Sequence, residues 1–513
     1  MDNMFCYQCE QTAGNRGCTM HGVCGKRPET AAAHDRLTSE LVVLALVLKN
    51  QNAVPDGQTS ALIREGLYTC MTNVDFDTSR VLELARKVSS VCGWFSRGSS
   101  VPQFQLSDVW KEQPNLRALK STLLFGLRGM AAYASHAAAL GESDPTVDAF
   151  FIEGLAALGE NHDEKRLAVM LKRLGQVNYR CLQILDRANT AAFGDPVPVR
   201  VSRTVEPGPF IVVTGHDLKD LKELLEATDG TGVNVYTHGE MLPAHGYPKL
   251  GAHRQLRGNY GSAWQNQQHE FDNLPAPILW TSNCLMMPRP SYFDKVWTTN
   301  AVAYRETRRI DTRDGRKDFG PLVAAAKAAG GWDRPKSFYG VNGGSVLVTG
   351  CGRSAALALV PKIGELVRAG RIGGFLLVGG CDGANPGRSV YTDAVRNAPR
   401  DHVVLTLACG KYRFNDLNLG EIDGVPRLLD FGQCNDVYGA IQFALALGDE
   451  FGCGVNELPL KILLSWYEQK AVAVLLTLIA LGIHDIRLGP SAPAFLTPEI
   501  LANLSAAYGL KMI

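Results

Sequence analysis

The feature that most constrains the fold of this chain is a pattern that recurs after residue 205. A short apolar run rich in β-branched residues is followed by a turn with Gly or Asn, and often by a helical pattern, as in FIVVTGHDLKDLKELLEA at 210–227. Strands that alternate with helices build a mostly parallel sheet. A polar, glycine-rich stretch at 311–345 interrupts this alternation. We therefore expect two α/β domains.

The chain before residue 190 shows a different periodicity. Apolar side chains recur there at steps of three and four residues, which is typical of helices in a bundle. Two such stripes are Leu116, Leu119, Leu123, Leu127 and Met130, and Leu167, Met170, Leu174, Cys181 and Leu185. A segment that no helix interior tolerates then follows, with Pro196, Pro198, Pro207 and Pro209. The predicted domains are a helical bundle over 1–205 and α/β domains over 206–352 and 353–513.

Four cysteines lie close together near the amino terminus. Cys6 and Cys9 form a CxxC pair, and Cys18 and Cys24 follow after gaps of eight and five residues. A structural zinc site normally uses two tight CxxC-type pairs. The wider second pair favours an iron–sulfur cubane over zinc.

Composition and charge exclude several classes of protein. The chain has 52 basic and 51 acidic residues and a net charge of +1, which argues against a nucleic-acid partner. Its longest apolar run, 471–483, is shorter than the ~20 residues that span a bilayer. The amino terminus lacks the features of a signal peptide, so we expect a cytoplasmic protein without a membrane partner. In a reducing compartment the 13 cysteines need an explanation other than disulfides.

Seven residues with metal-binding side chains follow predicted strands. Ligands of open α/β sheets lie beyond the carboxyl ends of the strands, so these side chains are expected to meet at one place. They are His216 after FIVVTG, Glu240 after VNVYTHG, Cys284 after PILWTSN, Cys381 after FLLVGG, Cys409 after HVVLTLA, Cys434 after RLLDFGQ and Glu468 after KILLSWY. One such cysteine alone is usually a buried apolar residue, and one such glutamate is usually a partner for a helix amino terminus.

The types of these ligands carry chemical information. Four thiolates suit iron with sulfide, whereas two carboxylates and an imidazole suit iron bound to oxygen or nitrogen. The set therefore predicts a cluster with a sulfide half and an oxygen-rich half. At the oxygen-rich end a small molecule with an N–O or O–O bond can bind and be reduced.

Weaker signals are interpreted more simply. Gly350, Gly352 and Ala355 have the spacing of a dinucleotide fingerprint, but the expected acidic residue is missing, and the nearest candidate is the distant Asp382. We therefore do not expect nicotinamide binding. His238 is either a proton relay or a histidine held by local hydrogen bonds.

Several cysteines lie outside both predicted metal sites. The cysteines without partners at metal-binding spacing, which we expect in the core, are Cys70, Cys92, Cys181 and Cys453.

The whole chain resembles the hybrid cluster proteins, also called prismane proteins or hydroxylamine reductases. The resemblance rests on the segments MFCYQCEQTAGNRGCTMHGVCGK, GHDLKDL, YTHGEMLPA, TSNC, GGCDG, ACGKYRFN, FGQCND, SWYEQKAVAVLL and IRLGPSAPAFL. It implies a helical domain followed by two Rossmann-like α/β domains, with a hybrid cluster between the domains. The spacing of the amino-terminal cysteines resembles the form of the family that carries a [4Fe–4S] cubane.

By this resemblance the hybrid [4Fe–2O–2S] cluster is held by the seven residues that follow the strands, His216, Glu240, Cys284, Cys381, Cys409, Cys434 and Glu468. Cys381 corresponds to a cysteine that the family carries as a persulfide, and Lys470 matches a lysine near the cluster. The segment around Cys351 and Arg353 departs from the family pattern. Cys351 also follows a predicted strand, but the resemblance does not make it a ligand.

The resemblance implies an oxidoreductase that reduces hydroxylamine to ammonia and water, with nitric oxide reduction in nitrosative stress defence as a second activity. The candidates for supplying protons are Glu240, Glu468, Lys470 and His238. The expected partners are a small-molecule substrate and an electron donor protein. Two alternatives remain, a nitric oxide or redox sensor that trans-nitrosylates proteins and a carbon monoxide dehydrogenase-like enzyme. The latter is disfavoured because no further cysteine occurs between Cys24 and Cys70.

Overall fold

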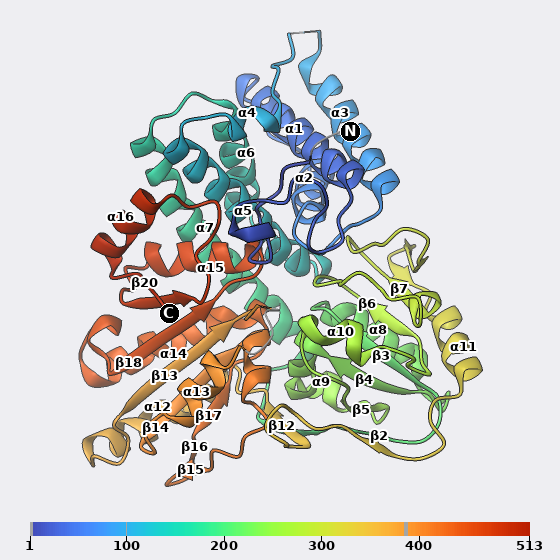
Figure 1. Ribbon diagram of the computed structural model, residues 1–513, viewed down its shortest axis with the longest axis vertical. Coiled ribbons are helices and arrows are strands. Elements are labelled where there is room, and N and C mark those ends of the chain that lie inside the picture. The colour runs from blue at the N-terminus through green and yellow to red at the C-terminus, as the bar shows by residue number, and fades with distance from the viewer. Residues whose placement is uncertain (1–3, 99, 384–387) are drawn as a thin grey trace.

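A computed structural model describes residues 4–98, 100–383 and 388–513. The helices of the amino-terminal part lie at one end of the molecule, and two sheets lie side by side at the other end (Figure 1). None of the helices in the described ranges is long and apolar enough to cross a membrane.

The amino-terminal part is helical, as the apolar stripes predict. Aspartate side chains accept a backbone N–H at the start of several helices, as Asp77 does from Ser79 and Arg80 at the start of α3. The helical elements are η1 (Ala13–Asn15), α1 (Pro28–Asn50), α2 (Gly57–Thr69), α3 (Thr78–Ser96), α4 (Leu106–Trp110), α5 (Pro114–Ala139), α6 (Pro145–Gly159) and α7 (Glu164–Phe193).

The first sheet has six parallel strands in the order β5-β4-β3-β6-β7-β8. They are β3 (Phe210–Thr214), β4 (Asn234–His238), β5 (Leu256–Asn259), β6 (Ile278–Trp280), β7 (Val296–Thr298) and β8 (Arg308–Arg309). Ile211 and Val213 face a core that includes α8 (Leu218–Thr228), whereas Phe210 and Val212 face the opposite core. The other helical elements here are η2 (Gly239–Gly246), α9 (Pro248–Gly251), η3 (Trp264–Asn266), α10 (Gln267–Glu270), η4 (Phe293–Lys295) and α11 (Gly320–Ala329).

The second sheet repeats this topology in the order β17-β14-β13-β18-β19-β20, again all parallel. Its strands are β13 (Gly374–Gly380), β14 (His402–Leu407), β17 (Leu428–Asp430), β18 (Leu460–Ser465), β19 (Ile486–Gly489) and β20 (Lys511–Met512). Its helical elements are α12 (Arg353–Arg368), α13 (Val390–Arg396), η5 (Cys409–Arg413), η6 (Cys434–Asp436), α14 (Val437–Phe451), η7 (Val455–Glu457), α15 (Gln469–Ala480) and α16 (Pro498–Tyr508). Both sheets have the strand order of a Rossmann fold, so the predicted fold class is confirmed.

Short antiparallel pairs connect the segment before the first sheet with the segment before the second. β1 (Val199–Ser202) pairs with β12 (Val346–Thr349), and β2 (Thr204–Val205) pairs with β11 (Lys336–Ser337). The other pairs are β9 (Thr312–Arg313) with β10 (Arg316–Lys317) and β15 (Glu421–Ile422) with β16 (Val425–Pro426). The domain boundaries at 205/206 and 352/353 stay a prediction.

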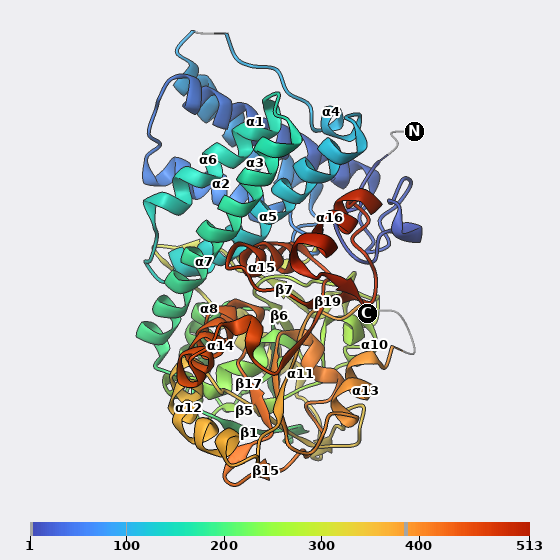
Figure 2. The same ribbon diagram turned by 90° about the vertical axis from the view of Figure 1, so that its left-hand side faces the viewer.

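Helix α15 belongs to the second α/β unit in sequence, but it packs on α5 and α7 of the helical part (Figure 2). Glycines allow this close approach. A Cβ atom at Gly129 would lie 2.3 Å from the backbone oxygen of Gln469, and one at Gly175 would lie 2.1 Å from that of Leu476. The helical part thus fixes the position of the first turn of α15.

Replacing Gly129 with Ala should push the first turn of α15 away from α5. Because overpacking a core costs about 1–3 kcal/mol, the thermal unfolding midpoint should fall. Gly93→Ala in α3 is the matched control, since a Cβ atom there would meet no atom of the other described residues within 4 Å outside the backbone of its own helix, and alanine favours helix. The packing argument fails if Gly129→Ala is as stable as Gly93→Ala.

Candidate metal centre

The structure places the seven predicted ligands at the carboxyl ends of strands. His216, Glu240 and Cys284 follow β3, β4 and β6 of the first sheet. The second sheet contributes Cys381 after β13, Cys409 at the start of η5 after β14, Cys434 at the start of η6 after β17, and Glu468 after β18. All seven line one cavity between the two sheets.

Atoms from the two sheets meet directly in this cavity. The Sγ atom of Cys434 lies 3.2 Å from Nε2 of His216. Nε2 of His216 lies 3.8 Å from Oε2 of Glu240. These three side chains offer donor atoms within 4.8 Å of one another, as the ligands of one metal ion do. The rule that ligands of parallel sheets lie beyond the carboxyl ends of the strands therefore correctly predicted that these side chains converge.

Glu240 has one carboxylate oxygen occupied and one unpartnered. Oε2 accepts a hydrogen bond from the backbone N–H of Cys434 at 2.7 Å. Oε1 is buried and has no hydrogen-bond partner among the residues that the structure describes. A buried carboxylate oxygen without a partner is costly, so this atom is suited to bind a cation.

His216 is oriented by Ser282. The hydroxyl of Ser282 donates to the backbone oxygen of Asn283 and accepts the backbone N–H of His216. It lies 3.0 Å from Nδ1 of His216. With the Ser282 proton directed to Asn283, Nδ1 donates to Ser282, and Nε2 faces Cys434. Burial, together with the charge of Lys470, lowers the pKa of His216 well below its ordinary value, so the ring is neutral.

Glu468 occupies the turn between β18 and α15. Its Oε2 accepts the backbone N–H of Lys470 at 2.8 Å, so it is the N-cap of α15, and it also lines the cavity. The geometry of Glu468 is therefore compatible with both roles expected from the sequence, a partner for a helix amino terminus and a metal ligand. Burial raises the pKa of Glu468, and the positive charge of Lys470 opposes this shift.

Lys470 is fully buried, and its Nζ has no hydrogen-bond partner in the described part of the chain. Burial alone would lower the pKa of this amine. The negative charges of ionised Cys434 and Glu468 outweigh burial and raise the pKa, which favours the ammonium form. Lys470 thus supplies a positive charge beside the predicted ligands.

The thiols of Cys381, Cys409 and Cys434 lie in an environment that opposes their ionisation. Burial raises the pKa of each thiol well above its ordinary value, and neighbouring acidic groups such as Glu240 raise it further. Lys470 alone cannot balance four thiolates and two carboxylates. A cluster of several metal cations can, and the mixture of sulfur, oxygen and nitrogen donors fits an iron–sulfur–oxygen cluster.

The four amino-terminal cysteines form a second group. Cys6 and Cys18 are joined by two backbone hydrogen bonds, and Cys9 and Cys18 are buried. The backbone N–H of Ala13 donates to Sγ of Cys18 at 3.5 Å. Burial raises the pKa of Cys9 well above its ordinary value, and the nearby Cys24 and Cys6 thiols raise it further. Four gathered thiols with an N–H···S bond fit a cubane.

A stacked aromatic pair lies between the two groups of cysteines. The rings of Trp264 and Tyr467 are 3.7 Å apart and nearly parallel. Both are buried in one apolar cluster that also contains Cys9 and Cys381. The indole N–H of Trp264 donates to the backbone oxygen of Cys381. The two rings thus fill buried apolar space that contains cysteines of both groups.

The amino-terminal loop is also anchored to the turn that carries Glu468. The backbone N–H of Glu10 donates to the oxygen of Tyr467, and the side chain of Gln469 donates to the oxygen of Gln8. The two predicted centres therefore share their scaffold.

Some predicted residues lie outside the cavity. His238 is buried, with Nε2 2.9 Å from Oε2 of Glu270 and Nδ1 3.1 Å from Oγ1 of Thr214, so local hydrogen bonds hold it. It does not line the cavity formed by the described residues. Cys351 is buried outside that cavity, and its backbone N–H donates to the oxygen of Asp430.

The remaining cysteines and the residues that the sequence analysis missed also have clear places. Cys70, Cys92 and Cys181 are buried and Cys453 is partly buried.

The sequence analysis did not predict three residues that shape the site, which are Ser282, Trp264 and Tyr467. Only Tyr467 carried a signal, because it adjoins a predicted ligand.

Comparison with known proteins agrees with this geometry. Residues 4–512 match the Prismane/CO dehydrogenase family. The chain belongs to that family. It is 45% identical to the hydroxylamine reductase of Maridesulfovibrio salexigens over 531 residues, covering 99% of this chain and 98% of the relative. It is 42% identical to the hydroxylamine reductase of Rhodobacter capsulatus, with the same coverage.

Solved structures of carbon monoxide dehydrogenases have a similar fold. Carbon monoxide dehydrogenase IV from Carboxydothermus hydrogenoformans has a TM-score of 0.57 at 15% identity, covering 96% of this chain and 86% of that chain. A carbon monoxide dehydrogenase from Thermococcus sp. AM4 has a TM-score of 0.57 at 17% identity, covering 99% and 88%. At these identities the likeness concerns the fold alone.

Replacing Ser282 with Ala removes the acceptor for the Nδ1 proton of His216. Losing such a partner typically weakens metal affinity about 10- to 100-fold, so the protein should lose iron from the central site faster in a chelator. Ser262→Ala is the control, because that buried serine bonds Glu270 on the far side of His238. Equal iron loss in both variants would contradict the role of Ser282.

Proposed function

We propose that this protein is an iron–sulfur hydroxylamine reductase. The observation that carries the proposal is the convergence of four thiols, two carboxylates and one imidazole on a single buried cavity. The hydroxylamine reductases that the chain resembles over nearly their full length support the choice of substrate.

Cys6, Cys9, Cys18 and Cys24 would hold the [4Fe–4S] cluster. The seven ligands of the central cavity would hold the hybrid [4Fe–2O–2S] cluster, with Cys381 as the persulfide. These groups supply electrons and a Lewis-acidic iron. The balanced reaction takes hydroxylamine, two electrons and two protons to ammonia and water.

The chain's own residues handle the protons and exclude water. Glu240 and Glu468 line the cavity and Lys470 follows Glu468, so these are the candidates for delivering protons. Nζ of Lys470 has no hydrogen-bond partner among the described residues. His238 contacts Glu270 instead, so any role in proton supply is indirect. The buried Trp264 and Tyr467 keep bulk water from the electron path between the two centres.

The test is turnover of hydroxylamine to ammonia by anaerobically purified protein with reduced methyl viologen. Glu468→Gln keeps an oxygen that can accept the Lys470 N–H but removes the anionic donor. We expect loss of the central-site spectrum and of turnover, with the amino-terminal cluster retained. A Glu468→Gln protein with a normal spectrum and rate would refute the ligand assignment, and wild-type protein without ammonia formation would refute the function.

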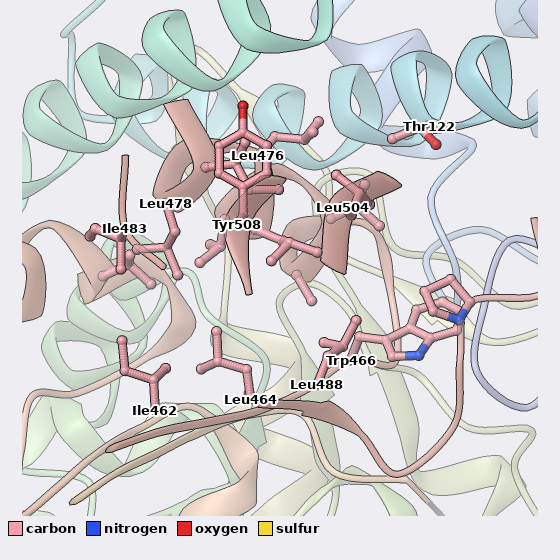
Figure 3. A pocket seen from close by; sticks show the side chains of 18 of the residues that line it. Thr122, Ile462, Leu464, Trp466, Leu476, Leu478, Ile483, Leu488, Leu504 and Tyr508 are labelled. Carbon is pink, nitrogen blue, oxygen red and sulfur yellow. The ribbon is translucent and has the colours of Figure 1, made fainter. Parts of the chain in front are cut away.

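A second substrate, nitric oxide, is favoured by an apolar cavity of about 470 Å³. Its lining reaches from Cys434 and Glu468 to the exposed Lys165 and Lys172 on α7. Apolar side chains such as Leu464 on β18 project into it (Figure 3). An uncharged diatomic molecule partitions into such a space better than hydroxylamine, which must give up its hydrogen bonds to water. This supports a role in nitrosative stress defence.

Leu464→Trp should fill part of this cavity and slow nitric oxide reduction while hydroxylamine reduction persists. The neighbouring Leu463 packs in the core on the other face of the sheet, so Leu463→Trp is the control. Anaerobic nitric oxide consumption and ammonia formation are measured for both variants. An unchanged ratio of the two activities in Leu464→Trp would contradict the apolar route.

The proposed reductase activity also implies an electron donor and a cellular location. The enzyme needs an electron donor protein. We place the enzyme in the cytoplasm, because none of its 13 cysteines is paired in a disulfide, as suits a reducing compartment. The alternative, a nitric oxide sensor that trans-nitrosylates proteins, uses the same cluster but turns over little substrate, so the ammonia assay separates the two.

A further inference from the structure

We propose that the amino-terminal loop around Cys18 and Cys24 is the docking surface for a small acidic one-electron carrier protein. This inference rests on the proposed reductase and names the partner that would supply its electrons. The docking surface consists of Arg16, Met20, Val23, Arg27 and Met287.

The loop lies at the edge of the molecule, where a partner can reach it (Figure 2). Cys6 and Cys24 are only partly buried, as are Cys284 and Cys434 of the central cavity. Because the chain beside Cys24 is exposed at Met20 and Val23, a protein partner can approach the amino-terminal cysteines there.

Three exposed apolar side chains lie near Cys24 in the chain or against its neighbour Gly25. Met20 is 76% exposed, Val23 is 56% exposed and Met287 is 42% exposed. Met287 comes from the segment after β6 and packs on Gly25, because a Cβ atom there would lie 2.9 Å from its sulfur. Methionine side chains are flexible and polarizable, which suits a surface that binds a partner briefly. Exposed apolar residues gathered at one place mark interaction sites.

The charge of the loop determines the kind of partner. Between residues 4 and 27 the exposed charged side chains are Arg16 and Arg27, and the only carboxylate, Glu10, is buried against Arg388. Arg27 also lies 3.6 Å from the exposed Glu29, a surface pair that contributes little. A basic rim around an apolar centre fits an acidic carrier, and opposite charges speed the encounter of transient complexes.

The test follows electron transfer from a reduced acidic [4Fe–4S] ferredoxin to the oxidised holoprotein, by rapid mixing without hydroxylamine. In this step the ferredoxin loses one electron and the amino-terminal centre gains it. We expect Arg16→Glu to lower the second-order rate constant about tenfold and to flatten its dependence on salt, as loss of a rim charge does. Val23→Glu should also lower it.

The matched control is Val169→Glu on α7, since Val169 is 60% exposed and lies outside the loop. It should leave the rate constant unchanged, and all three variants should keep the dye-driven turnover of the wild type. Wild-type rate constants for both Arg16→Glu and Val23→Glu would overturn the docking surface. An equal decrease in Val169→Glu would overturn it too. If the wild-type protein shows no dye-driven turnover of hydroxylamine, that result refutes the proposed reductase function instead.

Discussion

The structure depends on the carboxylate, thiol and imidazole side chains that gather at the carboxyl ends of the strands in two parallel sheets. Because both sheets have the same strand order, their switch points present ligands from both sides of one cavity. The donors repel one another when ionised and are shielded from water, so the protein alone stabilises them poorly. Bound cations would remove this repulsion, so we expect metal binding and folding of this region to be coupled.

The helical part and the amino-terminal loop hold this arrangement in place. Gly129 and Gly175 let α5 and α7 approach the backbone of α15, whose N-cap is Glu468. Gln8 and Glu10 bind the residues on either side of Glu468. One turn between a strand and a helix thus contacts the helical part, the loop of the first cysteine group and the central cavity.

Much of this could be predicted from the sequence because the rules involved are local. The cysteine group at 6–24 needs only short-range spacing, and the seven central residues need only the rule that parallel strands end at a common edge. The orientation of His216 by Ser282, the stacking of Trp264 on Tyr467 and the packing of α15 on α5 depend on contacts between distant segments. No pattern in a single sequence specifies such contacts. The positional rule also included Cys351, which the fold places outside the cavity.

Diffraction from anaerobically grown crystals on both sides of the iron absorption edge tests the central claim most directly. The account predicts anomalous density from iron at two places, one among Cys6, Cys9, Cys18 and Cys24 and one in the central cavity. In the cavity, iron should lie within bonding distance of His216, Glu240 and Glu468 as well as the cysteines. Zinc at either place, or iron bonded to the four central cysteines alone, would contradict the account.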